Sequence, residues 1–322
     1  MQTPTEAGPR ALPEQAPRVL PEEEWREREA RHHARVDALV SAHLERRAAG
    51  VKHPVEDFLF TYYSHKPAQL RRWHPGAGVA LAGMDPEGVR WYRASGDASA
   101  PGTVAAELDV PAFLERKGAT VAFVLRLLRA VQGRPAHLGC FGLHEWAMVY
   151  RLGQEQVRHS AVPLRLGREG TDAVVESHRI TCSHYDAFRF FTEEARPLNR
   201  LRPTREGQAD LDQPGCLHAN MDLYKWSYKL SPLVPSELVV DCFVFAKDIR
   251  VLDMRASPYD LEAHGYTPVR IETAEGKAEY LEAQRSFAER GAELRSRLLE
   301  VLGRVEHLIP AQPRPARTSP ES

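Results

Sequence analysis

Three short segments of the chain each pair a cysteine with a histidine and surround them with aromatic and ionisable side chains. They read GCFGLHEWAMVY over 139–150, CSHYDAFRFF over 182–191 and CLHANMDLYKW over 216–226. Imidazole, carboxylate and indole groups together can move protons, stabilise positive charge and stack on a flat ligand. Ionisable groups on largely apolar helices must be paired or serve chemistry, so we expect the three segments to meet at one pocket.

The third segment carries the densest set of such groups. His218 and Asp222 stand four residues apart and share one helix face, and Lys225 and Trp226 follow one turn later. We predict that His144, Asp186, His218 and Asp222 converge although they come from separate segments. A network of ion pairs that only stabilises the fold is the alternative for the same residues.

The cysteines of these segments are candidate zinc ligands. Zinc prefers thiolate and imidazole ligands, and Cys140, Cys182 and Cys216 each have a histidine within four residues. The spacing does not match a usual zinc knuckle, and free cysteines are commonly buried in ordinary cores. We therefore predict no metal or other cofactor, with these three cysteines as the candidate ligands if zinc binds.

Two further stretches could bind an anion. Asp253 and Arg255 lie in DIRVLDMRASPYDL, where an arginine next to a turn could hold an anionic ligand through two hydrogen bonds, although a salt bridge that anchors the loop explains them equally well. The stretch RPLNRLRPTR carries four arginines without an acid, including Arg200 and Arg202. A solvated basic loop is the common explanation, and contact with phosphate is the functional one.

Composition limits the classes of function. The chain of 322 residues has 43 basic and 44 acidic side chains, which excludes a strongly basic body that holds nucleic acid by charge alone. We find no apolar run that could span a membrane and no apolar signal core, so we expect a cytoplasmic protein without membrane contact. Motifs for dinucleotides, P-loop phosphates, zinc proteases and serine hydrolases are missing from the sequence.

Periodicity predicts a mainly α fold with a minor small β-sheet. We expect disordered tails over 1–20 and 310–322 and a single globular domain over 21–309. Helical patterns lie at 21–50, 109–134, 139–153 and 274–308, and the segments 216–235 and 236–261 are typical either of two helices or of one helix and one buried apolar run. GVALAG and GVRWYRA, separated by MDPEG, predict a β-hairpin, and the segments 159–167 and 173–183 are also typical of strands.

Several long motifs resemble a known family. HPVEDFLFTYYSHKPAQLRRWHPG, CFGLHEWAMVYR, CSHYDAFRFF, PGCLHANMDLYKW and LDMRASPYDL together resemble bacterial proteins, common in actinobacteria, that carry the name 3-methyladenine DNA glycosylase. The similarity covers about residues 51–300. Of the hairpin motif in well-studied alkylpurine glycosylases, WHPGAGVALAG keeps only Pro75, Gly76 and Gly78.

The resemblance implies hydrolysis of the bond between an alkylated purine and its sugar in DNA, as a step of base-excision repair. A carboxylate stabilises the positive charge that develops on the sugar. Implied roles follow for three groups of residues. The catalytic group is Asp222 with Glu145, Asp186, His218 and His144. The stacking group is Trp226, Tyr224, Trp146 and Tyr185, and the phosphate-binding group is Lys225, Arg200, Arg202 and Arg255.

Two other classes remain open from the residues alone. The first is a hydrolase or lyase that acts on a small polar metabolite, with His144, His218 and Asp222 as acid and base groups and with or without a metal. The second is a non-catalytic module whose aromatic clusters bind a ligand. A closed pocket with converging histidines and carboxylates favours the metabolite enzyme, and a positive stripe that leads to the pocket favours DNA.

Overall fold

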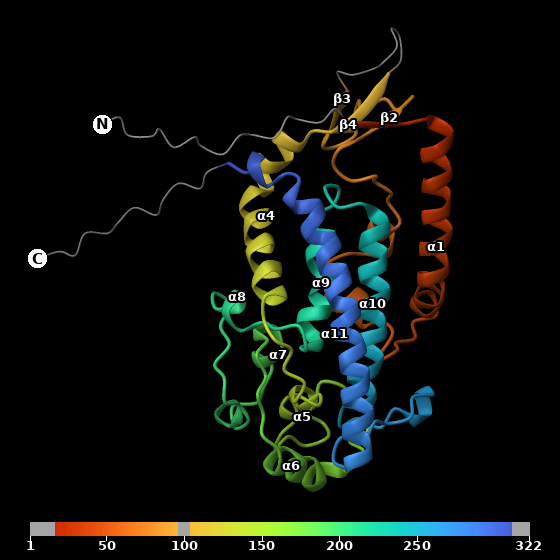
Figure 1. Ribbon diagram of the computed structural model, residues 1–322. Helices are drawn as coiled ribbons and strands as arrows, with labels where there is room; N and C mark the ends of the chain where they lie inside the picture. The colour runs from red at the N-terminus through yellow and green to blue at the C-terminus, as the bar shows by residue number, and fades with distance from the viewer. Residues whose placement is uncertain (1–16, 96–103, 311–322) are drawn as a thin grey trace, which may run out of the picture.

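The computed structural model describes residues 17–95 and 104–310, and most of these residues lie in helices (Figure 1). The four long helices that form the body are α4 (Val110–Gln132), α9 (Leu217–Lys229), α10 (Ser236–Arg255) and α11 (Ala274–Gly303). Helix α11 packs on the other three, and α9 packs along α10. The fold is mainly α with a small sheet, as the sequence predicted.

Apolar side chains hold these four helices together. No residue of helix α10 is exposed, and Phe243, Phe245 and Ile249 are fully buried. A helix that is covered on all sides lies in the centre of a bundle, with other elements packed around it. Outside it lies α1 (Glu22–Ala48), a long charged helix that contacts the body through a narrow stripe containing Val36 and Val40.

Short helices surround the long ones. They are α2 (Phe58–Tyr62), α3 (Pro67–Leu70), α5 (Leu143–Ala147), α6 (Gly167–Ser177), α7 (Tyr185–Phe188) and α8 (Gln208–Leu211), with 3₁₀ turns η1 (Arg196–Leu198), η2 (Glu262–His264) and η3 (Glu306–Leu308). In Figure 1, α5 and α6 lie at one end of the long helices and the sheet lies at the other end.

The sheet has four strands, and its topology differs from the predicted hairpin. The strands are β1 (Arg18–Leu20), β2 (Val79–Ala82), β3 (Tyr92–Ala94) and β4 (Ala105–Leu108). Their order is β1-β2-β4-β3, so β4 lies between β2 and β3 and pairs antiparallel with both. The predicted direct pairing of β2 with β3 is therefore wrong.

Three other expectations about local structure need correction or fall outside the described residues. Arg18–Leu20 is not part of a disordered tail, because it pairs in parallel with β2 and buries Leu20. The rest of the predicted N-terminal tail up to residue 16, and residues 311–322, lie outside the described residues. The segment 173–183 is not a strand: Gly167–Ser177 forms helix α6, and Ile180 makes an isolated bridge to Asn199.

No helix in residues 17–95 and 104–310 combines the length with the apolar composition that crossing a bilayer requires.

Candidate active site

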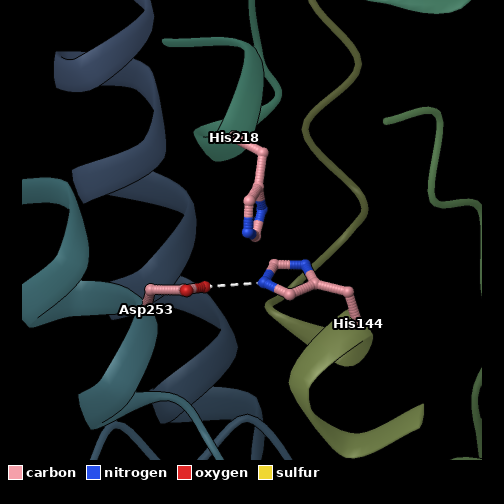
Figure 2. Close-up of side chains that lie close together, drawn as sticks. All are labelled: His144, His218 and Asp253. Atoms are coloured by element: carbon pink, nitrogen blue, oxygen red, sulfur yellow. Dashed lines mark hydrogen bonds and ion pairs between the residues drawn. The ribbon is translucent and has the colours of Figure 1, made fainter. Parts of the chain in front are cut away.

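The site lies where α5, the start of α9 and the end of α10 meet. These elements contribute His144, His218 and Asp253 respectively (Figure 2). Helix α5 can enter the bundle here because Gly142 adopts a left-handed φ of 69°. A Cβ atom at this glycine would also lie only 3.4 Å from Cβ of Ala256.

The first half of the site is a buried network of charged groups. His144 Nε2 and Asp253 Oδ1 are 2.7 Å apart, and the guanidinium of Arg250 donates to Asp253 Oδ2 at 3.2 Å and to Glu145 Oε1 at 2.9 Å. Burial opposes ionisation of Asp253, but His144 and Arg250 outweigh it and lower the pKa of this carboxyl. The carboxylate in turn raises the pKa of His144 against the effect of burial.

The second half is a buried network around Asp222. Lys225 Nζ donates to Asp222 Oδ2 and to Asp186 Oδ2, each at 2.8 Å. His184 Nε2 and the hydroxyl of Tyr63 reach Asp222 at 3.3 Å and 3.4 Å. Burial alone would raise the pKa of Asp222, but Lys225 and His184 lower it, so Asp222 is an ionised carboxylate.

His218 connects the two halves. Its ring lies edge-on to His144, with 4.5 Å between the ring centroids, and stacks on His184 at 5.4 Å. The described residues provide no hydrogen bond to either of its ring nitrogens. Burial lowers the pKa of His218, and the neighbouring imidazoles His144 and His184 lower it further, so this ring is neutral.

Two cavities meet at His218. The larger has a volume of about 190 Å³, and eight of the thirteen residues that line it carry ionisable side chains, among them Glu145, Arg158, His159, Asp186 and His218. The smaller has a volume of about 20 Å³. It is lined by His144, His218 and the three predicted cysteines, together with other residues. A cavity of the smaller size holds about one water molecule.

The structure brings the predicted acid and base residues together, except that Asp222 lies outside both cavities. His144 contacts His218, and His218 shares the larger cavity with Glu145 and Asp186. Asp222 is linked to this group through His184 and Lys225, but it lines neither cavity. Asp222 is thus placed to hold other residues rather than to touch a ligand in either space.

The predicted stacking residues do not form the pocket. Trp146 and Tyr224 are fully buried, and Trp146 Nε1 donates to the carbonyl of Ala256 at 2.8 Å. Trp226 is 8% exposed, and Tyr185 is half-buried at the start of α7. None of the four lines either cavity, and Trp146 and Tyr224 have no exposed face on which a ligand could stack in this structure.

The predicted phosphate-binding residues differ in their surroundings. The ammonium of Lys225 is held by two carboxylates, and Arg255 donates to Glu279 and to the carbonyl of Thr267, so both cations have partners within the chain. Arg202 donates to carbonyls of its own loop, at Asn199 and Leu201, and is exposed. Arg200 is exposed on the same loop.

The three cysteines line the smaller cavity. Cys140 Sγ is 3.6 Å from His144 Nδ1, and Cys182 Sγ donates to the carbonyl of His184 at 3.7 Å. Burial raises the pKa of the Cys182 and Cys216 thiols, which favours the neutral, weakly ligating form. Cys242 is buried within α10 and lines neither cavity.

Sequence reasoning missed Arg250, His159 and the aromatic residues that do line the larger cavity, including Phe190 and Tyr259. Arg250 and Asp253 stand three residues apart on a helix that is rich in apolar side chains, which was a usable signal. No signal in the sequence indicated His159, because this residue lies in an irregular segment whose path depends on tertiary contacts.

Comparison with known proteins adds no assignment: the sequence matches no protein-family model, and no curated protein or solved structure was found to be similar to it.

Proposed function

We propose that the protein is an enzyme, a hydrolase or lyase, that acts on a small polar molecule bound in the larger cavity. One observation carries the proposal: carboxylates, imidazoles and guanidiniums line a single cavity of about 190 Å³. General acid–base catalysis needs such groups within hydrogen-bond reach of one substrate. Ordinary binding pockets are lined mostly by apolar side chains with few polar groups.

The lining indicates the size and charge of the substrate. Pockets for drug-sized ligands have volumes of about 300–1,000 Å³, so this cavity suits a smaller molecule. Arg158 is exposed at the cavity, and its guanidinium lies over the ring of Phe190. The carboxylates Glu145 and Asp186 are already bound by Arg250 and Lys225. Among the residues that line this cavity, Arg158 is thus a cation that no carboxylate of the described residues binds, and we expect it to hold a carboxylate or another anionic group of the substrate.

Individual residues have distinct roles in this proposal. His218 presents ring nitrogens without protein hydrogen-bond partners among the described residues, and thus can accept a proton or hold a reacting group. His159 lies in the same cavity wall as a second imidazole. Asp222 and His184 position the ring of His218, because His184 stacks on this ring and Asp222 holds His184.

The glycosylase activity that the resemblance implies receives less support from these contacts. Its chosen carboxylate, Asp222, lines neither cavity, and Lys225 is already bound to two carboxylates. The loop containing Pro75, Gly76 and Gly78 leads into strand β2 instead of a helix. We therefore test release of a methylated base from DNA as the competing activity.

The test is to incubate the purified protein with an extract of low-mass metabolites and to follow every compound by mass spectrometry. We expect at least one anionic compound to be consumed by the wild type, and consumption to slow by about 10² or more in His218→Ala. His307→Ala, which changes an exposed histidine in η3, is the matched control and should act like the wild type.

The competing arm uses duplex DNA that contains 3-methyladenine. Salt-dependent binding that weakens in Arg200→Ala, together with release of the methylated base and no consumption of any metabolite, would overturn the proposal in favour of the glycosylase. Consumption of a metabolite that is unchanged in His218→Ala would place the chemistry away from this cavity and would also contradict it.

A further inference from the structure

We infer that His144, His218 and Asp253 form a binding site for one divalent first-row transition-metal ion. The three residues come from α5, α9 and α10, and one donor atom of each lies within 4.8 Å of the other two. Figure 2 shows the ring of His218 directed at the pair formed by Asp253 and His144. Two imidazoles and one carboxylate are a recurring ligand set of catalytic zinc and non-haem iron sites.

The observed distance between the first two donors fits neighbouring positions around a metal. His144 Nε2 and Asp253 Oδ1 are 2.7 Å apart. Two ligand atoms that each lie about 2.1 Å from a metal are separated by about 3 Å when they subtend a right angle at the ion. The pair therefore needs to move by only a few tenths of an ångström to occupy adjacent octahedral positions.

Both members of this pair also have the outer contacts that orient metal ligands. The second carboxylate oxygen of Asp253 accepts a hydrogen bond from Arg250, and the second ring nitrogen of His144 faces Cys140 Sγ at 3.6 Å. Such partners fix the ligand orientation in metal sites. With the imidazole of His144 neutral, as a metal ligand must be, Glu145, Asp253 and Arg250 together carry a net charge of −1, so a dipositive ion is compatible with this buried environment.

The third ligand leaves the ion accessible. His218 lies in the wall of both cavities, so an ion that it binds is next to the larger cavity. With three protein ligands, the remaining positions are free for water and for an anionic substrate. This catalytic role rests on the proposed function, whereas binding of the ion itself does not.

The cysteines are not the ligands in this inference. Among the described residues, no cysteine belongs to a group of three donors that lie as close together as the His144, His218 and Asp253 set. Cys140 lies on the Nδ1 side of His144, away from the nitrogen that faces Asp253. We therefore expect cobalt(II) to bind with nitrogen and oxygen ligands and without a thiolate.

The test uses the full-length chain without an affinity tag, stripped with a chelator and then given iron(II), manganese(II), cobalt(II) or zinc(II) one at a time. We expect about one ion per chain to remain after desalting and the midpoint of thermal unfolding to rise. In His218→Ala the affinity for cobalt(II) should fall by about 10² or more. Within residues 17–95 and 104–310 the ring of His218 makes no hydrogen bond that this change would break, so the variant should keep the near-ultraviolet circular dichroism of the wild type.

One control variant and three further outcomes decide the inference. His159→Ala removes an imidazole of the larger cavity that is outside the triad, and it should retain the ion. Failure of the wild type to retain any of the four ions, or equal retention by His218→Ala, would overturn the inference. An intense sulfur-to-cobalt charge-transfer band would overturn it as well, because it would assign the ion to the cysteines. Retention of the ion without turnover of any metabolite would leave the metal site standing and contradict only the proposed function.

Discussion

Lys225 is the residue whose removal should most disturb the buried network around Asp222. Its ammonium is bound by Asp222 and Asp186, and only 14% of its side chain is exposed. Lys225→Met keeps much of the apolar stem but leaves Asp222 as a buried carboxylate with less compensation. We expect the free energy of unfolding to fall by about 3–5 kcal/mol, measured by urea denaturation.

A matched control lies one turn further along the same helix. Lys229 also places its ammonium over the ring of Trp226, but it is exposed and makes no ion pair among the described residues. Lys229→Met should change the free energy of unfolding by less than about 0.5 kcal/mol. In the double variant Lys225→Met with Asp222→Asn, part of the lost stability should return. Equal effects of the two single changes would show that Lys225 does not compensate a buried charge.

The sequence allowed part of this site to be predicted, for a physical reason. His144, His218, Asp222 and Lys225 were recognisable because ionisable residues on apolar helices are rare without a partner or a function. Which group pairs with which could not be predicted, since the contact of His144 with Asp253 joins residues more than 100 positions apart. The aromatic residues were assigned to ligand stacking because the sequence alone does not distinguish a buried indole from one that faces a ligand.

At the scale of elements, helices were predictable and strand pairing was not. The pattern over 21–50 predicted helix α1 to within two residues at each end, because local periodicity and terminal charges define a helix. The sheet depends on contacts between distant segments instead. Strand β4 lies between β2 and β3, and β1 joins β2 from the start of the chain. Short strands such as Ala105–Leu108 carry too little pattern to reveal this order.

The contact between α9 and α11 depends on a glycine. A Cβ atom at Gly291 would lie 2.3 Å from Oδ1 of Asn220, the atom that accepts the hydrogen bond of the buried Arg295 at 2.9 Å. Gly291→Ala must therefore separate the helices or break this bond. We expect the free energy of unfolding to fall by about 1–3 kcal/mol, measured by urea denaturation.

Gly303, at the end of the same helix, provides the comparison. A Cβ atom there would meet no heavy atom within 4 Å. Because alanine favours the helix more than glycine does, Gly303→Ala should leave the protein as stable as the wild type or stabilise it by up to about 1 kcal/mol. If Gly291→Ala were equally harmless, the close approach of α9 and α11 at Asn220 would not be a packing constraint.

At the scale of the whole molecule, two half-buried histidines lie near the C-terminal end of α9 and the start of α10. His74 lies near the sheet, where its Nδ1 is 3.3 Å from the hydroxyl of Tyr92, and His65 stacks on Tyr228 at 4.6 Å. Burial, reinforced by the charge of Arg72, lowers the pKa of each of these two histidines from 6.5 to about 4. Both rings are therefore neutral in the folded protein at pH 7.

These two histidines should make the fold sensitive to mild acid. Between pH 6.5 and about 4 the unfolded chain binds a proton at each position that the folded chain does not bind. Their contribution to stability is therefore complete above pH 6.5 and is lost as the pH falls, by up to about 1.4 kcal/mol per pH unit for each histidine. Urea denaturation over this interval should give a smaller slope of unfolding free energy against pH for His65→Gln with His74→Gln than for the wild type. The exposed-site variant His307→Gln should keep the wild-type slope. Identical slopes in the double variant and the wild type would mean that His65 and His74 titrate alike in the folded and unfolded chains.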